Sequence, residues 1–75
     1  MELERFISDF ADQFDDTDVS EINAGTEFYE LEEWSSLTMM GLIALVRTKY
    51  GKIITGKEIR DCTTVKDLFD LINSK

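Results

Sequence analysis

Two adjacent serines, Ser35 and Ser36, are the residues of this sequence best placed to take part in chemistry. They stand directly before a segment of helical periodicity that continues to Gly51. The start of a helix has unpaired backbone N–H groups and the positive end of the helix dipole, and both favour an anion attached there. Serine is also a preferred N-cap residue, which is the commoner role for a serine in isolation. With two serines present, Ser35 can cap the helix while Ser36 is modified.

Nothing in the sequence would turn these serines into nucleophiles. The chain has no histidine to accept a serine proton, and no catalytic triad is recognisable. Its single cysteine, Cys62, shares apolar spacing with Ile59 and Val65 and is expected to be a small core residue. We therefore expect a protein in which neither serine is a catalytic nucleophile.

Metal sites are poorly supported as well. One cysteine and no histidine rule out the common zinc ligand sets. Four oxygen-bearing residues fall at ligand positions of a calcium-binding loop, but Glu21 occupies the position that needs glycine for the sharp turn. The four are Asp16, Asp18, Ser20 and Glu27. We expect no metal.

Length and charge narrow the class further. The 75 residues make one domain, 1–75, and their 8 Lys+Arg against 16 Asp+Glu give a net charge of −8. This charge repels nucleic acids and anionic membranes and attracts basic protein surfaces. The lone thiol suits a reducing compartment, and no apolar run approaches the roughly 20 residues of a membrane span. We expect a cytoplasmic monomer that binds no nucleic acid and does not insert into membranes.

The periodicity predicts an all-α fold. A first helix of about thirteen residues follows from apolar residues at helical spacing: Leu3, Phe6, Ile7, Phe10, Ala11 and Phe14. Its acidic outer face, which includes Asp9, is expected to be simply solvated. A long loop from Asp15 to Ser35 comes next, and we expect apolar residues to anchor it: Val19, Ile22, Phe28, Leu31 and Trp34. Capping patterns at Thr55–Glu58 and Thr64–Asp67 predict a short third helix and a last helix.

The second helix, Ser36 to Gly51, is largely uncharged on both sides. One side carries Met39, Leu42, Ile43, Val46 and Tyr50, and the opposite side carries Leu37, Met40, Gly41, Ala44 and Thr48. A chain this small has no core large enough to bury a helix all round, so the surplus side is expected to bind a partner. The alternative is that Met40 and Ala44 fill irregular gaps under the long loop.

Several motifs give the chain a resemblance to the acyl and peptidyl carrier proteins. Glu33-Trp-Ser-Ser-Leu37 resembles the Asp-Ser-Leu motif whose serine carries 4'-phosphopantetheine, and Thr26-Glu-Phe28 resembles the Thr-x-Phe entry to that motif. Further residues follow at intervals that resemble those of this family: Tyr50-Gly51, Ile53-Ile54, Glu58-Ile59 and Thr63-Thr-Val65. The resemblance covers the whole chain and implies a four-helix carrier fold with a long first loop and a short third helix. It also implies acyl groups held as thioesters on an arm at Ser36, with a phosphopantetheinyl transferase and acyl-transferring or acyl-modifying enzymes as partners.

The resemblance further implies an interior that can shelter an acyl chain, formed by Phe28, Ile54, Ile59, Cys62, Val65 and Leu68, which would otherwise be ordinary core. Two departures from the family stand out. Ser35 replaces the acid usual before the modified serine, and the second helix has no carboxylate but carries Arg47 and Lys49. A specialised lipid or secondary-metabolite pathway therefore fits better than bulk fatty acid biosynthesis. A peptidyl or aminoacyl carrier, or an acidic interaction module without a prosthetic group, remains an alternative.

Overall fold

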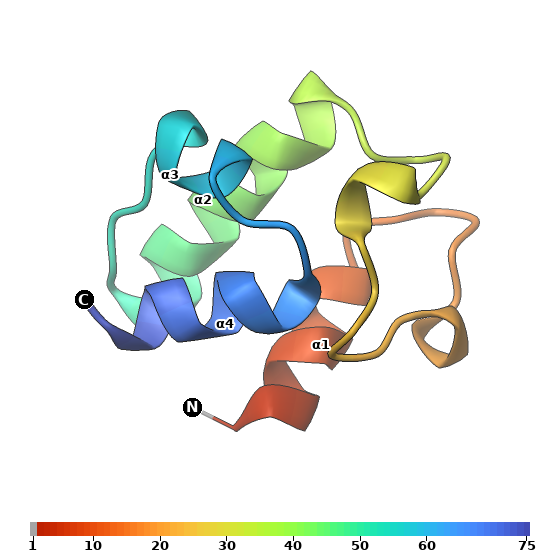
Figure 1. Cartoon of the computed structure of the whole chain (residues 1–75), viewed down its shortest axis with the longest axis horizontal. Coiled ribbons are helices and arrows are strands. Elements are labelled where there is room, and N and C mark those ends of the chain that lie inside the picture. The colour runs from red at the N-terminus through yellow and green to blue at the C-terminus, as the bar shows by residue number, and fades with distance from the viewer. Residues whose placement is uncertain (1) are drawn as a thin grey trace.

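The structure is a computed structural model that describes residues 2–75. Four α-helices form it: α1 (Leu3–Ala11), α2 (Ser36–Tyr50), α3 (Gly56–Arg60) and α4 (Val65–Asn73). Two short 3-10 helices, η1 (Val19–Glu21) and η2 (Phe28–Glu30), lie in the connection between α1 and α2. In Figure 1 this connection forms one side of the molecule, while α2, α3 and α4 form the other. The predicted all-α, four-helix architecture is confirmed.

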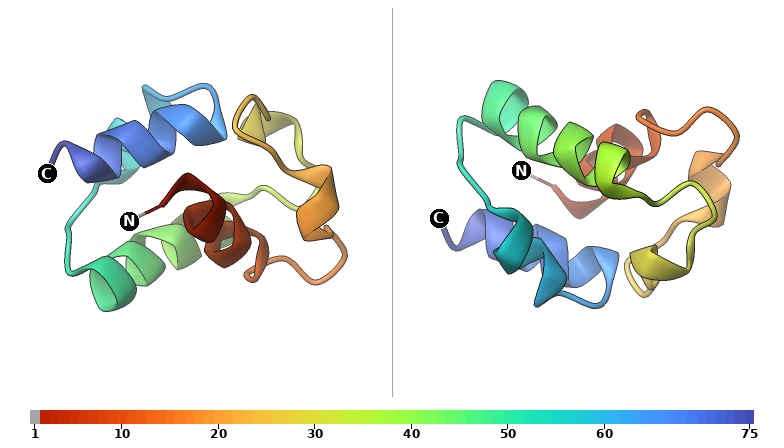
Figure 2. Two further views of the ribbon diagram at one scale, coloured as in Figure 1. Left: turned by 90° about the horizontal axis from the view of Figure 1, so that it is seen from below. Right: turned by 90° about the horizontal axis from the view of Figure 1, so that it is seen from above.

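A single apolar core joins all four helices. It contains thirteen buried hydrophobic residues, and no polar or charged residue is buried within residues 2–75. The two end views show α1 lying between α2 and α4 (Figure 2). Phe6 and Phe10 of α1, Leu42 and Val46 of α2, and Leu68 of α4 are each fully buried. Because burial of one such side chain contributes about 1.5–3 kcal/mol, this packing is the main support of the fold.

The first helix is shorter than predicted. It has 9 residues and ends at Ala11, and the Asp12 N–H still bonds to the Ser8 carbonyl. An acidic residue at Asp12 faces the negative end of the helix dipole, which disfavours continuation. Phe14 nevertheless reaches the core, because a turn closed by its N–H on the Ala11 carbonyl keeps nearly helical spacing.

The α1–α2 connection is well anchored. Ile22 and Phe28 are buried as expected, but Val19 is exposed because it begins η1 on the surface. The Val65 and Lys66 amides at the start of α4 donate to carbonyls of the connection, those of Thr26 and Ala24, at 3.0 and 2.9 Å. Side chains and backbone bonds thus fix a segment that lacks long helices.

The other helix ends follow the sequence closely. Thr55 and Thr64 cap α3 and α4, each in a reciprocal pair with the acid three residues later. Gly51 ends α2 in the left-handed conformation at φ 67°, which glycine adopts without steric cost. No helix within residues 2–75 is long and apolar enough to cross a bilayer.

Candidate functional site

The start of α2 shows how the two serines divide their roles. Ser35 has extended backbone geometry, and its hydroxyl accepts a hydrogen bond from the Thr38 N–H at 3.4 Å. In return, the Thr38 hydroxyl accepts from the Ser35 N–H at 2.8 Å. This reciprocal cap confirms Ser35 as the N-cap residue. Ser36 is the first residue of the helix and is exposed, so its side chain is not needed for capping.

The electrostatic setting of Ser36 suits an attached anion. The first turn of α2 contains no acidic residue, and its positive dipole end is therefore not neutralised by the helix itself. Glu33, the nearest preceding acid, is engaged elsewhere, since its carboxylate accepts from the Asp15 and Asp16 N–H groups and the Thr17 hydroxyl. The Thr17 bond is the main reason that the pKa of Glu33 is lowered. Sequence reasoning missed this role of Glu33, because residues 15 to 17 approach it only in the fold.

Aromatic packing fixes the path of the chain into α2. The Trp34 ring lies edge-on to Phe28, with centroids 4.9 Å apart, and stacks on Phe10 at 6.2 Å. Tyr29 packs against the same indole, and its hydroxyl donates to the Ile59 carbonyl at 3.1 Å. Trp34 therefore ties the residues just before Ser35 to α1 and η2, and Tyr29 links η2 to α3. The predicted role of Trp34 in anchoring the long loop is confirmed.

The two sides of α2 have different environments. Leu42 and Val46 on one side are buried in the core. On the opposite side Leu37 is 81% exposed and Met40 is 64% exposed. We define the outer face of α2 as its exposed residues nearest Ser36, namely Leu37, Met40, Gly41 and Ala44. These residues do not fill gaps beneath the loop, so that alternative is wrong.

The residues expected to shelter an acyl chain come together in the core. Five of the six are buried: Phe28, Ile54, Ile59, Val65 and Leu68. Cys62 is partly buried against them, with its thiol directed to the Glu58 carbonyl at 3.5 Å. Burial raises the pKa of the Cys62 thiol, which keeps it protonated at neutral pH. Cys62 thus packs against the core, as expected of a small apolar residue. The group of six is called the interior set below.

The apparent calcium-loop pattern has a different structural role. The Asp18 carboxylate accepts from the Ser20 N–H, and the Glu21 carboxylate accepts from the Asp18 N–H, so the two acids cap η1. Within residues 2–75, no group of three His, Cys, Asp or Glu side chains is arranged to hold a metal ion.

Comparison with known protein families identifies the chain. A model of the family described as "Phosphopantetheine attachment site" matches residues 4–72. The chain belongs to this family. It is therefore a phosphopantetheine carrier protein, and its domain is an attachment site for a covalent 4'-phosphopantetheine group. Carrier domains of this family act together with modifying and transferring enzymes and are generally non-catalytic. No curated protein and no solved structure matches the chain.

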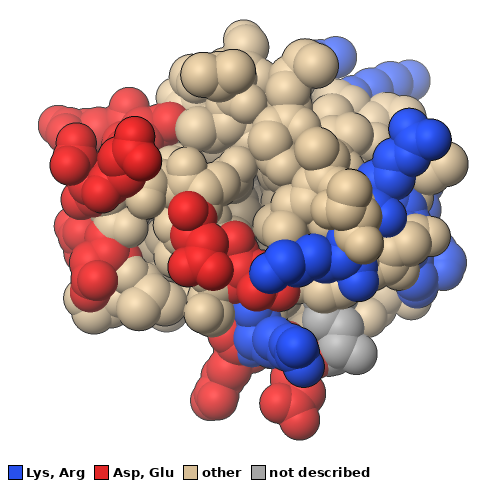
Figure 3. Space-filling view, turned by 180° about the vertical axis from the view of Figure 1, so that it is seen from behind, with Lys and Arg blue, Asp and Glu red and all other residues tan. Residues whose placement is uncertain are grey.

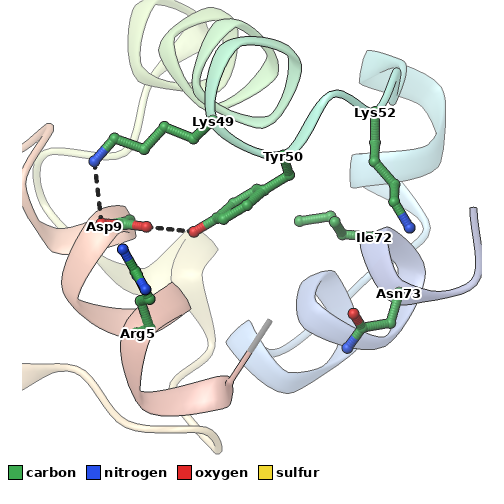
Figure 4. Close-up of a pocket in the computed structure, with 7 residues that line it drawn as sticks. All are labelled: Arg5, Asp9, Lys49, Tyr50, Lys52, Ile72 and Asn73. Atoms are coloured by element: carbon green, nitrogen blue, oxygen red, sulfur yellow. Dashed lines mark hydrogen bonds and ion pairs between the residues drawn. The ribbon is translucent and has the colours of Figure 1, made fainter.

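A second feature of this carrier protein was not expected from its sequence. The Tyr50 hydroxyl donates a hydrogen bond to the Asp9 carboxylate, and the Lys49 ammonium contacts the same group at 3.2 Å. Asp9, expected to be solvated, has a side chain only 13% exposed. The signal was weak in the sequence, because 41 positions separate Asp9 from Tyr50. This cluster lines a hollow at the end of α2 remote from Ser36 (Figure 4).

Proposed function

We propose that Ser36 carries the 4'-phosphopantetheine arm and that the chain presents acyl groups to partner enzymes. The observation that supports this assignment is the geometry at the start of α2, where Ser35 caps the helix and Ser36 stays exposed. The N–H groups and dipole of the first turn would stabilise the phosphodiester that links serine to the arm. When attached, the group supplies the thiol that holds acyl cargo as a thioester.

The protein's own contribution is attachment and presentation, without catalysis of the transfer. The chain has no histidine that could activate Ser36, and the Cys62 thiol is held protonated against the core. Ser36 is therefore a residue that a phosphopantetheinyl transferase acts upon. We infer a cytoplasmic monomer on the grounds of composition, charge and the single thiol.

The outer face of α2 is the proposed docking surface for these enzymes. Its apolar residues lie within about two helical turns of Ser36, so a partner that covers them also reaches the arm. Leu37 and Met40 expose enough apolar surface to act as anchors in a partner's pocket. Gly41 lies about one turn beyond Leu37 and leaves room for the Gln13 side chain, since a Cβ atom there would stand 2.8 Å from the Gln13 side-chain oxygen.

The charge of α2 bears on the pathway. Its 15 residues include no carboxylate, and its last turn carries Arg47 and Lys49. A partner with a strongly basic docking surface would be repelled by that end of the helix. The lack of carboxylates on α2 and its basic last turn favour a specialised lipid or secondary-metabolite pathway over bulk fatty acid synthesis. An aminoacyl or peptidyl cargo is the alternative, because the exposed position of Ser36 also suits cargo carried outside the fold.

The interior set is the proposed shelter for acyl cargo. All of its members are apolar or weakly polar, and they lie between η2, α3 and α4. The set is closely packed with the rest of the core, so entry of a chain would require α3 to shift. At five residues α3 is the shortest α-helix within residues 2–75, so few hydrogen bonds within the helix oppose such a shift.

Intact-mass spectrometry tests the assignment of Ser36. The purified chain is incubated with coenzyme A, Mg²⁺ and a phosphopantetheinyl transferase of broad specificity. We expect the wild-type chain and the matched Ser35→Ala variant to gain the mass of one arm, and the Ser36→Ala variant to gain none. Equal modification of Ser36→Ala, or no modification of a folded wild-type chain by any of several transferases, would contradict the assignment. In the second case the interaction-module alternative predicts that unmodified chain binds its partner at full strength through the outer face.

A further inference from the structure

The hollow at the remote end of α2, which we call the distal hollow, has a volume of about 530 Å³. Helices α1, α2 and α4 and the segment after Gly51 contribute to its walls, as Figure 4 shows. A rise of about 1.5 Å per residue puts Tyr50 about 21 Å along the helix from Ser36. The distal hollow is therefore separate from the proposed attachment site. Its size lies within the range of about 300–1,000 Å³ that is typical of small-molecule sites.

The one carboxylate in the distal hollow is already satisfied. Asp9 accepts hydrogen bonds from the Tyr50 hydroxyl and from Lys49, one on each carboxylate oxygen. These contacts, led by the Tyr50 bond, lower the pKa of Asp9, so it is ionised at neutral pH. Its charge is largely balanced by Lys49, and Asp9 is a weak obstacle to an incoming anion.

Within residues 2–75, two further cations of the distal hollow form no ion pair with a side-chain carboxylate. Arg5 makes no hydrogen bond or ion pair with any side chain of residues 2–75, and it points toward the hollow beside Asp9 (Figure 4). The Lys52 ammonium donates to the main-chain oxygen of Lys75, the last residue of the structure, at 2.9 Å. The side chains that line the hollow thus include three cations, Arg5, Lys49 and Lys52, and one carboxylate, that of Asp9.

The charge of the distal hollow contrasts with that of the whole chain. The net charge is −8, yet the space-filling view shows most of the Lys and Arg side chains on the side away from the largest group of acids (Figure 3). Only eight cations exist in the chain, and three of them line this one hollow. A concave positive site on an acidic protein attracts small anions while the rest of the surface repels large ones.

We propose that the distal hollow binds a compact polyanion, a small molecule with two or more phosphate or carboxylate charges. Arg5 and Lys52 are the residues that contact the anion, and Lys49 adds to the field. The Asn73 amide supplies a neutral donor, while Ile72 and the Tyr50 ring form an apolar wall. The planar guanidinium of Arg5 can pair in a bidentate manner with phosphate or carboxylate oxygens, and this would orient the anion in the hollow.

Such binding would link three helices that meet at this end of the fold. The contacts come from α1 through Arg5, from the end of α2 through Lys49 and from the end of α4 through Asn73. A ligand that binds only the folded state, and not the unfolded chain, raises the stability of the fold by mass action. The proposal does not depend on modification of Ser36, because it concerns the unmodified chain.

The test is a titration of the ¹⁵N-labelled, unmodified chain followed by NMR. Sodium pyrophosphate and sodium citrate are the two probes, and sodium chloride at matched ionic strength is the reference, since screening alone shifts exposed charged groups. We expect saturable shifts confined to residues around Arg5, 49–52 and Asn73. A phosphate ligand predicts tighter binding of pyrophosphate, and a carboxylate ligand predicts tighter binding of citrate.

Matched variants separate a site from general charge attraction. Arg5→Gln and Lys52→Gln should each weaken binding of the better probe at least tenfold, while Arg60→Gln, an exposed cation on α3 outside the distal hollow, should change it less than twofold. Equal weakening by Arg60→Gln, shifts spread over all cations, or no saturable shift with either probe would overturn the proposal. Amide spectra of each variant verify that the fold is retained.

Discussion

Replacement of Leu37 by alanine should separate docking from folding. Leu37 is 81% exposed, so only about a fifth of its side chain is buried by the fold. Full burial of a leucine contributes about 1.5–3 kcal/mol, and the folded state therefore gains only about 0.3–0.6 kcal/mol from this residue. The remaining four fifths, about 1.2–2.4 kcal/mol, are available to a partner that covers it. At about 1.4 kcal/mol per factor of ten, loss of these contacts with the partner corresponds to a decrease of about 7-fold to about 50-fold in kcat/KM for arm attachment.

The assay measures kcat/KM for arm attachment by a phosphopantetheinyl transferase, with product followed by mass spectrometry. Urea unfolding of the same Leu37→Ala protein provides the free energy of unfolding. Ile53→Ala is the matched control, because Ile53 is 69% exposed but lies beyond the far end of α2. We expect it to leave both quantities nearly unchanged.

Two results would refute the reasoning on Leu37. A kcat/KM within twofold of wild type would show that the transferase does not cover the outer face. A loss of more than about 1 kcal/mol in the free energy of unfolding would show that Leu37 supports the fold more than its exposure implies.

Three further changes test the ends and contacts of α2. Ser35→Ala should lower the free energy of unfolding by about 1 kcal/mol through loss of the cap, and a wild-type urea midpoint would contradict this. Gly51→Ala should lower the free energy of unfolding by about 1 kcal/mol, because the φ of Gly51 is 67° and alanine is strained there. Gly51→Asn should lower it less. An alanine variant as stable as wild type would contradict the left-handed geometry. Tyr50→Phe should raise the pKa of Asp9 toward its ordinary value, measured by carboxyl NMR. Because the folded-state pKa of Asp9 is lowered, its stabilising effect is full above about pH 4 and is lost as pH falls through that pKa. Tyr50→Phe should shrink this acid-dependent loss, and an unchanged pKa would contradict the role of the hydroxyl.

Local sequence signals were enough to predict most of the fold. The caps at Ser35, Thr55 and Thr64 involve residues within three positions of one another, so the pattern alone contains the interaction. Gly51 marks the end of α2 for the same reason, since a left-handed C-cap is a local preference. The end of α1 was misjudged because a turn at Ala11 preserved the apolar spacing up to Phe14.

Contacts between distant residues account for what the sequence did not reveal. Glu33 holds residues 15 to 17, and Asp9 meets Lys49 and Tyr50 across 40 and 41 positions. A helical pattern does not distinguish a solvated carboxylate from one that binds a side chain elsewhere in the fold. The exposure of the outer face of α2, by contrast, followed from the small size of the core. The attachment residue itself was predicted from the motif around Ser36 and stays a prediction.

The most direct test of the central claim is fragmentation mass spectrometry of the protein isolated from cells that naturally produce it. Fragment ions can assign a covalent group to one residue of the segment from Trp34 to Leu37. We predict 4'-phosphopantetheine on Ser36, with Ser35 unmodified. An arm on any other residue, or an unmodified Ser36 in every preparation, would contradict the proposal that this protein carries its cargo at the start of α2.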